Sequence, residues 1–239
     1  MKKLLLPVAG MLLAIASYGQ GAATMSLSTN GRQENGFTGA GYNETADQRL
    51  ERLASGAMYL RDVEGDAIVF KGNAEQEFTR GKVNVFANQI EWLDEEGGTI
   101  YYTPYIADGF TIKYPDEPYA RTFEVVVAPT FKKKRFMEVL SDGEVKFFRH
   151  YVVVKSLPGA NAAYNTSSSL DEFQLKEEYY IQFEGEELQQ FYPSKGQLKK
   201  IFRDRSDAVL QFMKSNRLRY SKVENVAKVF DFYNDSVDD

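Results

Sequence analysis

The sequence predicts a mainly β protein of the α+β class, in which an antiparallel β-sandwich or barrel-like domain is followed by a short C-terminal helical segment. From Ala57 to residue 192, short apolar and aromatic runs alternate with Gly, Asp, Asn and Pro, which is typical of closely spaced strands and turns. After Pro193 the apolar residues recur at the spacing of helices. A content of 14% aromatic and 43% hydrophobic residues agrees with a β-rich core.

The N-terminus has the pattern of a cleavable secretion signal over residues 1–19. A basic start at Met1–Lys3 precedes an apolar run from Leu4 to Ile15, and the small residues Ser17 and Gly19 stand at the two positions that signal peptidase recognises. Cleavage is therefore predicted before Gln20.

Cleavage after Ala16, with Ala14 two residues before it, is the alternative. The apolar run is much shorter than the roughly 20 residues that a membrane-spanning helix needs. We therefore expect a periplasmic or secreted protein that keeps no stable membrane anchor after the signal is removed. No cysteine is present, so neither a lipid anchor on cysteine nor a disulfide can form.

Residues 20–56 are rich in small and polar residues and predict a flexible leader, with one short helix from Thr45 to Ala54 that Gly56 ends. The β-rich domain is predicted over 57–192, and the helical segment with an acidic tail over 193–239.

Strands are predicted wherever β-forming residues lie between turn residues, and alternation is clearest at Val83 and Val85 and at Ile90 and Trp92. The predicted strands are Ala57–Leu60, Ala67–Lys71, Gln76–Arg80, Lys82–Ala87, Gln89–Leu93, Thr99–Tyr102, Phe110–Tyr114, Arg121–Val127, Arg135–Leu140, Val145–Lys155, Glu178–Phe183 and Leu188–Phe191.

Two hairpin turns are predicted between these strands. Glu95–Gly98 joins the strand of Trp92 to that of Tyr101, and Ser141–Glu144 supplies the Asp-Gly pair that tolerates positive φ. Residues Pro158–Leu170 predict a long polar loop.

Three helices are predicted after Pro193, at 195–203, 205–215 and 222–232. Ser194 with Gln197, and Ser221 with Glu224, have the spacing of a capping box. The apolar faces of these helices require each other or the sheet as a partner. Residues 234–239 predict a solvated acidic tail.

Charge narrows the possible partners. The chain has 29 basic and 34 acidic residues, and Lys2 and Lys3 leave with the signal, so the net charge of −5 becomes −7. An acidic exported chain lacks the cationic field that nucleic acid requires, so no nucleic-acid partner is expected.

Several segments together resemble a group of exported bacterial proteins of uncharacterised function, which have a β-rich domain and a C-terminal helical segment. Besides the signal that ends in Gln, the segments are Met58–Leu60, Phe136–Gly143, Tyr179-Tyr180, Ser194–Phe202 and Phe232–Asn234. The resemblance implies this fold and export, and it implies no activity.

An aromatic cluster is the main candidate ligand site. Tyr101, Tyr102, Tyr105, Phe110, Tyr114 and Tyr119 lie close together in the sequence, and Trp92 lies on an adjoining strand. Exposed aromatic rings could stack on sugars, whereas buried ones would form ordinary strand core and cross-strand pairs.

Catalytic candidates are few. His150 is the single histidine and has no nucleophile motif beside it, so a structural role is expected. The acidic groups Asp94, Glu95, Glu96 and Glu184, Glu186, Glu187 could serve glycoside hydrolysis, but they stand in predicted turns. No metal site and no cofactor are expected.

The sequence therefore favours an exported, non-catalytic protein that acts by binding or envelope interaction, with an envelope protein or a glycan as the partner. A carbohydrate or small-ligand module that uses the Tyr101–Tyr119 region is the alternative, and a carboxylate-based hydrolase is less favoured.

Overall fold

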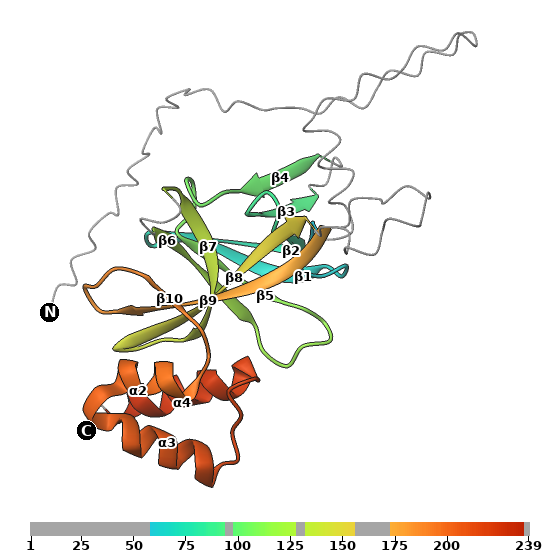
Figure 1. The fold of residues 1–239 in the computed structure, drawn as a ribbon. Helices are drawn as coiled ribbons and strands as arrows, with labels where there is room; N and C mark the ends of the chain where they lie inside the picture. The colour runs from blue at the N-terminus through green and yellow to red at the C-terminus, as the bar shows by residue number, and fades with distance from the viewer. Residues whose placement is uncertain (1–57, 94–97, 128–131, 156–172, 237–239) are drawn as a thin grey trace, which may run out of the picture. The chain divides into compact units, whose positions relative to one another are not determined.

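The computed structural model describes residues 58–93, 98–127, 132–155 and 173–236, and these residues form ten strands and three α-helices (Figure 1). The strands are β1 (Gly65–Lys71), β2 (Ala74–Asn84), β3 (Gln89–Leu93), β4 (Thr99–Tyr102), β5 (Gly109–Lys113), β6 (Arg121–Val127), β7 (Lys134–Ser141), β8 (Val145–Lys155), β9 (Phe173–Phe183) and β10 (Gln189–Phe191). The helices are α2 (Lys195–Phe202), α3 (Ser206–Ser215) and α4 (Val223–Asp235), with a short 3₁₀ turn, η3 (Arg203–Arg205), between α2 and α3. The predicted mainly β, α+β class is confirmed.

All ten strands belong to one antiparallel sheet in the order β10-β9-β8-β7-β6-β5-β1-β2-β3-β4. The sheet is open, because β10 and β4 each have a neighbour on one side only among the described residues. Among the described residues, the strands thus form one open sheet, neither two separate sheets nor a closed barrel.

The sheet folds over on itself at β2. The first part of this strand pairs with β1, as in Phe78 with Ala67, whereas its last residues pair with β3, as in Val83 with Ile90. Arg80 has a φ of 62° and lies in a bulge of the pairing with β1, just before the residues that pair with β3, so the strand bends there.

The first hydrophobic core lies between the two arms of the folded sheet. It joins Val83 and Ile90 of β2 and β3 to Phe123, Phe136 and Tyr151 of β6, β7 and β8. Alternate residues of each strand face this core because successive side chains point to opposite sides of a sheet.

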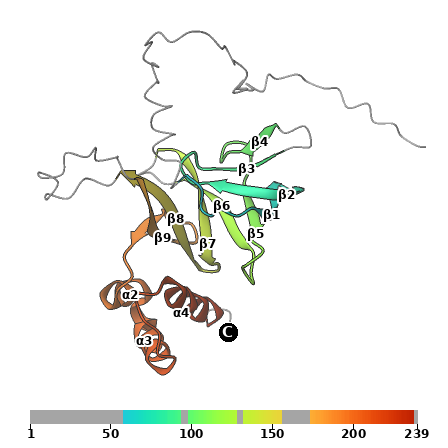
Figure 2. The same cartoon turned by 90° about the vertical axis from the view of Figure 1, so that its right-hand side faces the viewer.

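The second core joins the helices to the sheet. Phe147 of β8 and Phe191 of β10 contact Phe230 of α4, with ring centroids 4.7 and 5.6 Å from it. Figure 2 shows the helices gathered into one group beside the strands. None of the helices in the described part of the chain is long and apolar enough to cross a membrane.

Asn234 anchors α4 to the β7–β8 turn. Its side-chain amide nitrogen donates to Ser141 Oγ and to the carbonyl oxygens of Asp142 and Val145 at 3.0–3.3 Å, and its oxygen accepts from the Val145 amide at 3.0 Å. The predicted solvated tail is therefore wrong at its start, because Asn234 is buried and α4 continues to Asp235. We name this contact the Asn234 anchor.

The predicted elements differ from the structure in a few places. The two strands predicted on either side of Gly81 are one strand, β2, and β9 begins at Phe173 instead of Glu178. The first predicted strand is reduced to a bridge between Tyr59 and Asn84. The signal, the leader with its helix, and the loop at 158–170 lie outside the described residues.

Two capping boxes were predicted, and in one of them the serine caps its helix. Ser194 Oγ accepts from the Gln197 amide at 3.2 Å, as predicted for the start of α2. Helix α4 begins after Lys222 with no side-chain cap, so the predicted capping role of Ser221 is wrong. Contacts of α4 with the sheet, including the Asn234 anchor, hold this helix without it.

Candidate functional site

The predicted aromatic cluster is divided between the interior and the surface. Trp92 is 8% exposed, and its ring stacks on Phe78 and Tyr102 with centroids 3.8 and 5.3 Å apart. The Tyr102 hydroxyl donates to Gln76 at 2.6 Å. These rings therefore form core contacts between β2, β3 and β4, as the cross-strand interpretation predicted.

Tyr114 and Phe110 are fully buried, so neither can meet a ligand at the surface. Both belong to the first core, and the guanidinium groups of Arg61 and Arg121 lie 5.3 and 5.8 Å from the centroid of the Tyr114 ring. Phe110 lies on β5 and Tyr114 directly follows it, in the middle of the sheet order, where both faces of a strand can be covered.

The remaining members, Tyr101, Tyr105 and Tyr119, are exposed by 40%, 62% and 79%. Tyr101 lies on β4 and Tyr105 in the turn that follows it, whereas Tyr119 lies in the loop after β5. The structure thus retains only Tyr101 and Tyr105 as exposed aromatic residues at β4.

We define the β4 rim as Ile100, Tyr101, Tyr105 and Ile106. It comprises four of the nine large apolar side chains that are exposed among the described residues. β4 is also the last strand of the sheet and pairs only with β3 in the described part of the chain, as in Tyr101 with Glu91. The rim therefore combines exposed apolar side chains with a strand edge that can accept a further strand.

A row of charged side chains crosses the sheet between the two cores, and sequence reasoning did not find it. Opposite charges alternate along it in seven residues from the 58–62 segment, the loop after β5 and strands β6–β9. This ionic row consists of Asp116, Arg61, Glu117, Arg121, Glu138, Arg149 and Glu177.

Glu138 is the centre of the ionic row, with its side chain 7% exposed. It accepts from Arg149 Nε at 2.9 Å and from the Tyr151 hydroxyl at 2.6 Å, and Arg121 Nη1 lies 3.9 Å away. Burial and the neighbouring Glu138 carboxylate raise the pKa of Tyr151 above its ordinary value. Both hydrogen bonds reach Oε2, so this buried carboxylate links β7 to β8 through its pair with Arg149.

The sequence contains one indication of the ionic row, which is that Glu138 and Arg149 stand inside otherwise apolar strand segments. A charged residue at a core position requires a partner of opposite charge. The bulge that sets this pairing is a feature of the folded hairpin, so the sequence pattern alone does not identify Arg149 as the partner of Glu138.

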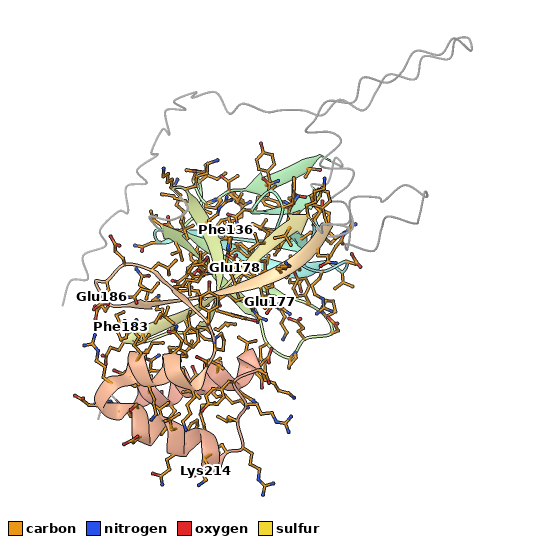
Figure 3. The ribbon with its side chains drawn as sticks, in the orientation of Figure 1. Phe136, Glu177, Glu178, Phe183, Glu186 and Lys214 are labelled. Carbon is orange, nitrogen blue, oxygen red and sulfur yellow. The ribbon has the colours of Figure 1, made fainter. Side chains whose placement is uncertain are left out.

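The predicted catalytic candidates lie in structural environments. His150 is 6% exposed, with Nδ1 3.6 Å from a Glu178 carboxylate oxygen, and burial lowers the pKa of its ring. Glu178 lies on β9 next to Glu177 of the ionic row, and both residues are labelled in Figure 3. The imidazole is thus a buried, neutral group at pH 7.

The described carboxylate candidates Glu184, Glu186 and Glu187 are all exposed in the β9–β10 turn. Glycoside hydrolysis needs a partly desolvated carboxyl group, which this turn does not supply. Asp94, Glu95 and Glu96 lie outside the described residues. Within the described ranges, no cluster of three or more His, Cys, Asp or Glu side chains could hold a metal ion.

We expect Tyr114→Phe to preserve or increase stability at pH 7, by up to about 1 kcal/mol, because the buried Tyr114 hydroxyl has no hydrogen-bond partner among the described residues. Its pKa is raised by burial from 10.0 to about 12. The folded state holds this proton more tightly than the unfolded chain does, so the stability of the parent is constant with respect to this group below pH 10 and falls as the pH rises through 12. The advantage of the Phe variant should therefore grow over that interval.

Urea unfolding of parent and variant at pH 7 and between pH 10 and 12 measures this effect. Tyr119→Phe is the control, because Tyr119 is 79% exposed. A clear loss of stability in Tyr114→Phe at pH 7 would show that the hydroxyl makes a favourable hydrogen bond.

The fold and the site define a class of protein: an open antiparallel sheet with a helical group on one part of it, and an exposed apolar edge. Comparison with protein-family models, with curated proteins and with solved structures finds no match.

Proposed function

We propose that this protein is an exported, non-catalytic interaction protein of the cell envelope that binds a partner protein through the β4 rim. The observation that carries the proposal is the concentration of exposed apolar side chains on an end strand of the sheet. An extended segment of the partner adds as a strand beside β4, and Tyr101 and Tyr105 supply contacts with its side chains.

The chemistry of the described residues supports a binding role over catalysis. The most buried carboxylate, Glu138, is bound by a guanidinium and a phenol, and the single histidine is a core group. By contrast, Tyr101 and Ile100 leave part of their apolar surface in water, and a partner can remove that surface from water.

Site-specific photocross-linking tests this function. We expect a benzophenone amino acid at position 101 to cross-link one reproducible envelope protein in intact cells, and the same group at position 119 to give no such product. Tyr119 is the matched control because it is also an exposed tyrosine, in a loop away from the end strand.

A second pair of variants tests whether the cross-linked product depends on the β4 rim. Ile106→Lys should abolish the cross-link from position 101, because a charged residue opposes apolar burial at a strand edge. Tyr192→Lys places the same charge at another exposed apolar residue and should leave the product unchanged. A product that survives Ile106→Lys, or equal products from positions 101 and 119, would contradict a site on β4.

Carbohydrate binding is the second candidate, favoured by the exposure of Tyr101 and Tyr105 beside the Trp92 stack. Trp92 is the single tryptophan, so its fluorescence reports on this region alone. Saturable quenching of Trp92 fluorescence by soluble envelope oligosaccharides would favour a glycan as the partner in place of a protein. A titration that leaves the fluorescence unchanged would count against a glycan partner.

A further inference from the structure

The helical segment has the opposite charge to the rest of the chain. Between residues 193 and 236 there are ten basic and five acidic residues, so this segment has a net charge of +5, whereas the rest of the chain has −10 within the total of −5. All ten basic side chains are exposed. They are Lys195, Lys199, Lys200, Arg203, Arg205, Lys214, Arg217, Arg219, Lys222 and Lys228.

A groove of about 720 Å³ opens on this cationic segment. Its lining includes Lys195 at the start of α2 and Lys214 near the end of α3, together with the apolar side chains of Leu210, Leu218 and Tyr220. Figure 3 shows Lys214 among the side chains of α3. No acidic residue is among the lining residues. We call this feature the helical groove.

The backbone around the helical groove is held in place by hydrogen bonds. The Leu218 amide donates to the Met213 carbonyl at 2.9 Å, and the Asn216 amide donates to the Phe212 carbonyl at 3.0 Å. Met213, below the groove, is 3% exposed and belongs to the second core. The groove walls are therefore fixed by the core, so that binding need not order them first.

We propose that the helical groove binds an acidic peptide segment of a partner protein, with an aliphatic or aromatic side chain as its anchor. Carboxylates of the peptide face Lys195 and Lys214, and the anchor contacts Leu210, Leu218 and Tyr220. Salt screens charges beyond about 8–10 Å, so the local charge of the helical segment acts on such a peptide more than the distant acidic residues of the chain do.

The composition of the surface favours a peptide over the other anionic partners. A polysaccharide or nucleic acid supplies charge but no apolar side chain for the groove. Membrane-surface helices insert apolar side chains into the lipid, and among residues 193–236 none of the large apolar side chains is exposed. A peptide supplies both the charge and the apolar anchor.

The test measures the binding of a labelled synthetic peptide of alternating Glu and Leu residues to the purified protein by fluorescence anisotropy. We expect saturable binding that weakens with added salt, and weaker binding of a matched peptide in which Ser replaces each Leu. Lys195→Glu combined with Lys214→Glu should reduce the affinity at least about tenfold, which corresponds to a loss of about 1.4 kcal/mol.

Lys200→Glu combined with Lys228→Glu is the matched control, because it makes the same change of charge on the helical segment outside the groove lining. Its affinity for the peptide should change less than about twofold. Circular dichroism of both double variants checks that they keep the fold, which is expected because all four lysines are exposed.

Three results would overturn the proposal. Equal losses in the two double variants would show diffuse charge attraction without a site. Equal binding of the Ser-containing peptide would remove the role of the apolar walls. If the protein does not bind the peptide but sediments with vesicles that contain anionic lipid, the cationic surface binds a membrane instead. None of these results bears on the β4 rim, so this site and the proposed function fail or hold separately.

Discussion

Replacing Asn234 with alanine is expected to lower the free energy of unfolding by about 3 kcal/mol. The Asn234 side chain makes four hydrogen bonds to the β7–β8 turn, and the change would leave the Val145 amide and two carbonyl oxygens without that partner. Buried backbone groups without partners are the costly part of such a loss. Gly143 has a φ of 145°, and a side chain at this position would collide with the Asn234 side chain, so glycine leaves the room that the anchor occupies.

Urea unfolding followed by Trp92 fluorescence measures this loss. Asn216→Ala is the matched control, because Asn216 is an exposed asparagine near the end of α3 with one side-chain hydrogen bond to the Phe212 carbonyl. It should change stability by no more than about 0.5 kcal/mol. Equal losses of unfolding free energy in the two variants would show that the Asn234 anchor stabilises the protein no more than an exposed asparagine does.

Glu138→Gln is expected to lower the free energy of unfolding by about 3 kcal/mol, near the lower end for breaking a buried ion pair. The variant keeps the size of the side chain but removes the charge that faces Arg149 and Arg121. Their side chains are 13% and 21% exposed, so water cannot fully replace the lost carboxylate. The remaining pairs with Glu177 and Glu117 limit the loss.

Glu64→Gln makes the same chemical change in an exposed pair with Arg80, whose side chain is 62% exposed. No measurable change in stability is expected there, because surface ion pairs contribute little. The loss in Glu138→Gln should also persist in 0.5 M salt, since buried charges are screened much less than exposed ones. A loss that disappears in salt, or that Glu64→Gln reproduces, would contradict a buried ionic row.

Secondary structure was predicted well where local patterns determine it. Strands β6 and β8 have the predicted bounds, and α2 begins at the predicted serine cap. Alternation of side chains and cap chemistry are properties of neighbouring residues, so the sequence contains them directly. The start of β9 and the pairing of the 57–60 segment depend on partner strands, and these were missed.

The candidate site was predicted only in part. Tyr101 and Tyr105 are exposed beside an end strand, but Tyr114 is fully buried and Trp92 nearly so. An aromatic residue favours a strand, but this preference does not say whether its side of the sheet is buried or exposed. Exposure therefore depends on where a strand lies in the sheet order, and β4 is last in that order while β5 is sixth from the other end.

The pairing of Glu138 with Arg149 shows the same dependence. A tight turn at Asp142-Gly143 would place Glu138 opposite Phe147. The bulge between Val139 and Ser141 shifts the register, so that Glu138 faces Arg149 and Ser141 faces Phe147. Asn234, about 90 residues later in the chain, bonds to both sides of this turn.

The sequence by itself determined the β-rich class, the change to helices after Pro193 and the concentration of positive charge in the last segment. These features depend on composition and on contacts between near neighbours. The tertiary structure alone decided the open, folded sheet, the exposed β4 rim, the ionic row and the helical groove. The folded sheet and the ionic row join residues that are distant in the chain, and a register shift of a single residue would turn their side chains to the other face of the sheet. The exposure of the β4 rim depends on the place of β4 at the end of the sheet order. The helical groove depends on how α2, α3 and the turn after α3 pack together.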